Sequence, residues 1–200
     1  RSTHSGGFAL LDNAELYATD LTVEDPSGDT CYGAGVFARD HSQLEWSGGG
    51  VSGAAADEYR SGYTGGAIHL QGASSLEGTN LDFSDNLAYA GGALDIQASS
   101  TANLVSCTFE DNVAYAKGGA LRAYNSAAVQ CRGCTFEGNL AREGGAVDVS
   151  VDASFADEDG RYEDNEADSG DGGAIRVADR ADLALDGSSF EGNLAQESGG

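Results

Sequence analysis

A two-part motif returns along the chain at nearly fixed spacing. Its first part is Gly-Gly followed by a small and an apolar residue, and its second part is an aromatic residue with Asn three positions later. The Gly-Gly part begins at residues 6, 33, 65, 91, 118, 144, 172 and 199, the first two copies being degenerate. The repeat is therefore about 27 residues long, and internal repeats of this length indicate a solenoid or another array of stacked units.

The aromatic-x-x-Asn part occurs five times in the same phase relative to the glycines. We expect the aromatic rings to stack on one another in a core and the Asn amides to hydrogen-bond along the stack. The two glycines suit a tight corner with positive φ and close backbone approach. The paired positions are Phe83 and Asn86, Phe109 and Asn112, Phe136 and Asn139, Tyr162 and Asn165, and Phe190 and Asn193.

Apolar residues between these anchors alternate, which is typical of strands rather than helices. One such unit cannot bury its apolar face alone, so copies must stack. The sequence thus predicts an all-β, right-handed parallel β-helix over residues 1–200, with one repeat per coil, roughly seven coils and about 27 residues in each. Successive coils would rise by about 4.8 Å. The second coil is longer, and we assign its surplus, residues 54–64, to an inserted loop.

Charge excludes several classes of function. Asp and Glu outnumber Lys and Arg by 33 to 10, giving a net charge of −23. Such a chain would be repelled by nucleic acid and by anionic membrane surfaces. No apolar run approaches the roughly 20 residues of a membrane span, and no signal peptide is visible. Because the last residues open another motif, we expect the chain to be a segment of a longer array.

The GGA[I/L/V] and FxxN motifs together resemble the repeat of the polymorphic outer membrane proteins, best known from chlamydial surface autotransporters. The resemblance covers residues 65–200 well and residues 6–64 weakly. It implies an extracellular or surface-exposed β-helix and a role in adhesion to cells.

Two charged columns follow from the predicted stacking. The position between the inward residues after the glycines alternates in charge, and we expect exposed ion pairs there, each contributing about 0 to 1 kcal/mol and opposing a slip in register. The position after the aromatic residue is acidic in the last four copies and is either a solvated ridge or a Ca²⁺ site. No motif requires any other cofactor. The first column is His69, Asp95, Arg122, Asp148 and Arg176, and the second is Glu110, Glu137, Glu163 and Glu191.

The chain has four cysteines. Cys107 and Cys134 occupy the same position in adjacent coils, which places their Cα atoms within disulfide range, so we predict a bridge between them. Cys131 falls at an inward position and is expected to be a buried free thiol. Cys31 lies about four coils from Cys131, too far to pair with it.

The inserted loop carries Tyr59, Arg60 and Tyr63, which are candidates for binding a glycan, a cell-surface receptor or a neighbouring subunit. No catalytic residues are predicted, because no nucleophile, phosphate-binding or metalloprotease motif is present. We therefore expect a non-catalytic, extracellular or cell-surface protein that builds a filament or rigid stalk with copies of itself or adjoining repeats. The alternatives are an adhesin passenger domain that binds host cells or glycans and, third, a polysaccharide lyase or hydrolase, since β-helices host such enzymes.

Overall fold

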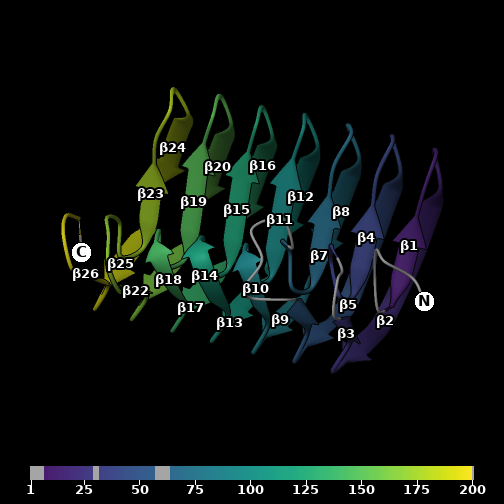
Figure 1. The fold of residues 1–200 in the computed structure, drawn as a ribbon, viewed down its shortest axis with the longest axis horizontal. Coiled ribbons are helices and arrows are strands. Elements are labelled where there is room, and N and C mark those ends of the chain that lie inside the picture. The colour runs from purple at the N-terminus through teal and green to yellow at the C-terminus, as the bar shows by residue number, and fades with distance from the viewer. Residues whose placement is uncertain (1–6, 29–31, 57–63, 200) are drawn as a thin grey trace.

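The computed structural model describes residues 7–28, 32–56 and 64–199. All regular structure in these ranges is β-strand, and no helix there could cross a membrane. The strands wind into a solenoid of seven coils, which lie side by side from the N-terminal to the C-terminal end in Figure 1. Three sheets run along the solenoid, and each coil contributes to all three.

Sheet A follows the glycine motif in each coil. Its seven strands are β1 (Phe8–Leu10), β4 (Val36–Ala38), β7 (Ile68–Leu70), β11 (Leu94–Gln97), β15 (Leu121–Tyr124), β19 (Val147–Ser150) and β23 (Ile175–Val177).

Sheet B is bent into two arms. The first arm contains β2 (Glu15–Glu24), β5 (Gln43–Ser52), β8 (Ser75–Thr79), β12 (Thr101–Val105), β16 (Ala128–Arg132), β20 (Ser154–Glu158) and β24 (Asp182–Asp186). The second arm contains β9 (Asp82–Ser84), β13 (Thr108–Glu110), β17 (Thr135–Glu137), β21 (Arg161–Glu163) and β25 (Ser189–Glu191). In the first two coils the long strands β2 and β5 run through both arms.

Sheet C follows the Asn of each motif. Its strands are β3 (Ser27–Gly28), β6 (Ala55–Ala56), β10 (Leu87–Ala90), β14 (Val113–Lys117), β18 (Leu140–Glu143), β22 (Glu166–Ala167) and β26 (Leu194–Ala195).

Neighbouring strands are parallel, and each residue pairs with its equivalent in the next coil. Phe109, for example, pairs with Phe83 on one side and with Phe136 on the other. The predicted all-β parallel helix with one repeat per coil is confirmed. Side chains that occupy the same place in the repeat consequently form continuous columns along the molecule.

The aromatic column runs through the core of the last five coils. Ring centroids of successive members are 4.7 to 5.0 Å apart, and the ring planes lie within 14° of parallel. Phe83, Phe109, Phe136 and Tyr162 are fully buried. Offset stacking of this kind adds to the free energy gained from burying the rings. The Asn column lies beside it, and Asn86, Asn112, Asn139 and Asn165 are also fully buried.

The two glycines of the Gly-Gly corner are required for different physical reasons. Gly118 has φ of +63°, a region that residues with a Cβ rarely adopt. Its neighbour Gly119 does not have positive φ, but a Cβ there would lie 2.1 Å from the carbonyl oxygen of Gly145 in the next coil. The second glycine is therefore required by the close approach of two coils.

Gly119→Ala should lower the free energy of unfolding by about 3 kcal/mol, at the upper end of the usual range for overpacked cores, because the new methyl group meets backbone rather than a movable side chain. Urea denaturation followed by circular dichroism measures the change. Ala120→Gly, one residue later, is the control for altered backbone entropy and should have a smaller effect, of about 1 kcal/mol. Equal losses in the two variants would contradict this explanation.

Candidate functional site

The charged column on sheet A forms two groups of ion pairs, one around Asp95 and one around Asp148. Asp95 accepts a hydrogen bond from Arg122 Nε at 2.6 Å and lies 2.8 Å from His69 Nδ1. Further along, Arg176 pairs with Asp148 at 2.8 Å. Ser150 and Gln97 donate additional hydrogen bonds to the two carboxylates. The register places opposite charges next to each other in successive coils.

The expectation that these pairs are exposed is wrong. Asp95, Asp148 and His69 are completely buried, and the Arg122 side chain is only 14% exposed. Successive side chains of a strand point to opposite faces of the sheet, and in β7, β11 and β19 the side chains on both faces are buried. Sheet A therefore has a covered outer face as well as a face toward the core. These are buried ion pairs, for which losing one partner is far more damaging than at the surface.

Asp95 remains ionised in this setting. Burial on its own would raise the pKa of its carboxyl group, but the charge of Arg122 and the hydrogen bond from His69 outweigh burial and hold the pKa well below its usual range. His69 Nδ1 also lies 3.0 Å from the Thr64 hydroxyl, and its ring packs against Phe37. The described part of the chain offers no hydrogen-bond partner to His69 Nε2. The group around Asp95 therefore ties the early coils to the middle ones.

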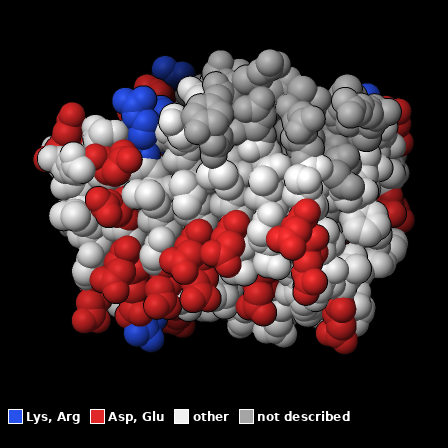
Figure 2. Space-filling model, turned by 60° about the horizontal axis from the view of Figure 1, so that its bottom comes forward, with Lys and Arg blue, Asp and Glu red and all other residues white. Residues whose placement is uncertain are grey.

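The acidic ridge is the column of Glu residues on the second arm of sheet B. The register brings Glu110, Glu137, Glu163 and Glu191 into one line. Figure 2, which brings the lower side of Figure 1 forward, shows clusters of Asp and Glu with few basic groups. Arg161 pairs with Glu163, and the neighbouring Glu137 and Glu191 help to raise the Arg161 pKa. Within the described ranges, no group of three or more His, Cys, Asp or Glu is placed to hold a metal ion.

Three cysteines gather at the bend between the two arms of sheet B. Cys107, Cys131 and Cys134 are buried free thiols, so the predicted Cys107–Cys134 disulfide is absent from the structure. Parallel stacking keeps equivalent Cβ atoms about 4.8 Å apart, farther than the roughly 3.8 Å of a disulfide. Cys107 Sγ instead lies 3.5 Å from the Val105 carbonyl oxygen, and Cys134 Sγ lies 3.7 Å from that of Leu104.

Asp157 is a buried acid in the same bend that sequence reasoning missed. It pairs in register with Cys131 and Leu185, so a carboxylate occupies a column of apolar residues. The sequence feature that could have revealed it is a pair of changes within one coil, Asp157 together with Gly160. Gly160 stands where the previous coil has Cys134, and a Cβ on it would lie 1.8 Å from Asp157 Oδ2. The glycine therefore makes the room that the carboxylate fills.

Burial raises the pKa of Asp157, against the lowering effect of a 2.7 Å hydrogen bond from Ser188 Oγ. Among the described residues, Asp157 Oδ1 and the Tyr162 hydroxyl have no hydrogen-bond partner. Burial raises the pKa of the Cys131 thiol as well. The bend thus places unpaired polar groups in an otherwise apolar core, and they should lower the free energy of unfolding at neutral pH.

Asp157→Asn should increase the free energy of unfolding at pH 7. Because the folded-state pKa is raised, the wild-type protein loses stability as pH rises above the unfolded-state value of about 4, and the amide does not. The gain should shrink as pH falls towards 4, which urea denaturation over that range measures. Asp186→Asn, on the exposed strand β24, controls for removal of one negative charge. Equal pH dependence in wild type and Asp157→Asn would contradict the assignment.

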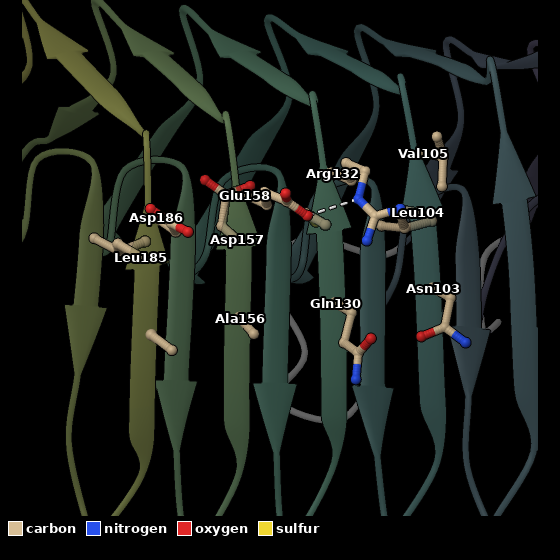
Figure 3. Close-up of a pocket in the computed structure, with 12 residues that line it drawn as sticks. Asn103, Leu104, Val105, Gln130, Arg132, Ala156, Asp157, Glu158, Leu185 and Asp186 are labelled. Atoms are coloured by element: carbon tan, nitrogen blue, oxygen red, sulfur yellow. Dashed lines mark hydrogen bonds and ion pairs between the residues drawn. The ribbon is translucent and has the colours of Figure 1, made fainter.

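A shallow groove of about 510 Å³ lies on the first arm of sheet B, over β12, β16, β20 and β24. Asn103 and Gln130 lie on neighbouring strands of its lining, and Arg132 pairs with Glu158 at 2.7 Å across it (Figure 3). Ala156 and Ala184 continue the row of the two amides. The groove therefore offers amide and charged groups at strand spacing on an open surface.

The remaining sequence predictions concern parts of the chain that the structure does not describe. Tyr59, Arg60 and Tyr63, the candidate binding residues of the inserted loop, lie outside the described residues. The same is true of Cys31. Their proposed roles stay predictions.

Comparison with known proteins places the chain by its fold. The family model described as a right-handed beta helix region matches residues 2–190, nearly the whole chain. No curated protein and no solved structure matched it.

Proposed function

The chain belongs to the right-handed β-helix family, and from this we propose that it is a non-catalytic structural repeat protein, a building block of an extracellular filament or stalk. The observation that carries the proposal is the unbroken stacking of equivalent residues. Every coil pairs with the next in sheets A, B and C, and the aromatic and Asn columns continue to the last coil. A molecule built this way is a stiff unit that can be lengthened by adding coils.

The surface fits the same role. A net charge of −23 with an acidic ridge along one side opposes lateral association between rods. Large apolar side chains that are exposed lie mainly in the first and last coils, including Phe8, Tyr17, Phe190 and Leu194. Repulsion between the sides of neighbouring rods favours growth along the axis.

Electron microscopy of the native assembly, with and without EDTA, tests the proposal. We expect elongated filaments or stalks whose diffraction shows a spacing near 4.8 Å along the axis, the distance between coils. Loss of order in EDTA would place Ca²⁺ on the ridge of Glu110, Glu137, Glu163 and Glu191. Compact isolated particles in both conditions would overturn the structural role.

The second candidate function is adhesion. It is supported by the resemblance of the GGA and FxxN motifs to polymorphic outer membrane protein repeats and by the open groove, where Asn103 and Gln130 present amides of the kind that hydrogen-bond sugars. A glycan array compares the wild-type chain with an Asn103→Ala, Gln130→Ala double variant. Binding that the double variant loses would support adhesion through the groove, and binding that it keeps would point to another surface.

A further inference from the structure

Two inward-facing positions, three residues apart, lie on either side of the bend of sheet B. In one coil they are Asp157 and Gly160, and a Cβ on the glycine would lie 1.8 Å from Asp157 Oδ2 and 2.5 Å from its Cγ. In another coil they are Gly78 and Leu81, and a Cβ on that glycine would lie 3.0 Å from Leu81 Cδ1. Side chains at the two positions therefore compete for the same space within their own coil.

The coil of β16 and β17 differs, because both of these positions are cysteine. The register pairs Cys131 with Asp157, and it pairs the residue after Cys134 with the residue after Gly160. Cys131 and Cys134 are only 5% and 0% exposed. Two Sγ atoms thus share the space that a single carboxylate fills in the next coil.

The two thiols also differ in their ease of ionisation. Hydrogen bonds from Cys107 and Cys131 lower the pKa of the Cys134 thiol, although burial opposes them. Burial and the hydrogen bond to Cys134 raise the pKa of the Cys131 thiol. Cys134 therefore carries the thiolate, which is the nucleophilic form of cysteine, beside a protonated partner.

Cys107 is the competing partner for Cys134. These two occupy equivalent positions in adjacent coils, where parallel stacking holds the Cβ atoms about 4.8 Å apart instead of the roughly 3.8 Å of a disulfide. Cys131 and Cys134 belong to one coil, so the spacing between coils does not separate them. The chain turns between them at Gly133, which has φ of +59°. The pair within one coil can therefore close without moving two coils together.

The groove on the first arm of sheet B gives access to this pair. Of the three cysteines in this part of the described chain, Cys131 alone belongs to the lining of the groove, whose volume is about 510 Å³. A small uncharged oxidant such as hydrogen peroxide can enter there, because the groove is open to solvent.

We propose that Cys131 and Cys134 form a disulfide within their coil when the protein reacts with hydrogen peroxide, and that Cys107 stays a thiol. One peroxide oxygen is transferred to one sulfur as a sulfenic acid, the O–O bond breaks, and the other oxygen leaves as water. The second thiol then displaces the sulfenic hydroxyl group, which also leaves as water, and the S–S bond forms. The two sulfurs together lose two electrons, which the peroxide takes up. This reversible covalent closure of the bend does not depend on the proposed structural role.

Peptide mapping of the full chain tests the proposal, because trypsin cleaves after Arg132, between the two cysteines. The chain is treated with hydrogen peroxide, unfolded in N-ethylmaleimide to block the remaining thiols, and digested without reduction. A Cys131–Cys134 bond links peptide 123–132 to peptide 133–142. A Cys107–Cys134 bond links peptide 61–117 to peptide 133–142 instead.

We expect the link between peptides 123–132 and 133–142 to exceed the other link about tenfold or more, and dithiothreitol to remove it. Cys107→Ser should leave the same link as the main product. Cys131→Ser should abolish it without creating a Cys107–Cys134 link. A predominant link to peptide 61–117, or oxidation to sulfinic acid with no link, would overturn the proposal.

The result for the wild-type chain decides the question even where a variant fails to fold. The bond is also measured within single chains, whether or not they assemble into filaments. The disulfide and the structural role can therefore fail separately.

Discussion

Asn139→Ala is expected to lower the free energy of unfolding by on the order of 4 kcal/mol. The substitution removes Oδ1, which accepts both the backbone N–H and the Nδ2 group of Asn112, and it also removes the hydrogen bond to the Phe109 carbonyl oxygen. All of these groups are fully buried, and each polar group left without a partner destabilises by about 1 to 3 kcal/mol. Urea denaturation measures the loss.

Two further variants test whether the lost stability comes from the hydrogen bonds of the Asn column. Asn139→Asp keeps the acceptor oxygens but lacks the amide donor, so it should fall between wild type and Asn139→Ala at pH 7. Asn103→Ala removes a half-buried Asn on the outer face of the first arm of sheet B, which bonds only Glu77, and should change stability little. If Asn139→Ala were no more harmful than Asn103→Ala, the Asn column would not hold the coils together.

Asp95→Ala is expected to lower the free energy of unfolding by about 3 to 5 kcal/mol, the range seen when one partner of a buried ion pair is removed. Arg122 and His69 would both lose their carboxylate within a covered sheet face. Asp152→Ala is the matched control, because Asp152 also pairs with an arginine, Arg180, but at an exposed turn. Its effect should be much smaller, although Asp152 has a φ of +58°, which Ala adopts less readily than Asp.

The same carboxylate makes stability depend on pH. Because the folded-state pKa of Asp95 is lowered, its contribution is present above the unfolded-state value of about 4 and is lost as pH falls below it. The wild-type protein should therefore lose stability in acid more steeply than Asp95→Ala does. Denaturation curves between pH 2 and 7 measure this difference, and parallel curves would show that Asp95 is not held ionised by its neighbours.

The fold could be predicted from the sequence because every repeat carries the same anchors. Gly119 and Phe136 stand at fixed places in the repeat, and parallel pairing turns such places into columns. The burial of Asp95 could not be predicted in this way. The alternation of apolar residues shows which side chains face the core, but it does not show whether the opposite, outer face of sheet A is covered.

The bend of sheet B could be predicted only in part. The shared position of Cys107 and Cys134 was evident, but the direction of their Cβ atoms, which decides between a bridge and two thiols, depends on the parallel geometry. Asp157 can be found in the sequence only by comparing it with Gly160, three residues away, because the missing Cβ of the glycine leaves the room that the carboxylate fills. Changes in side-chain size are compensated within one coil, whereas the kind of side chain is repeated from coil to coil along a column.

The coils are held together by a column of hydrogen bonds in which each Asn side chain donates to the Asn of the following coil. Amide hydrogen exchange along the Asn column of the unmodified chain tests it most directly. We expect strong protection at Asn112 and Asn139, weaker protection at Asn165 and almost none at Asn193. Uniform protection from Asn86 to Asn193, or fast exchange at Asn112 and Asn139, would contradict it.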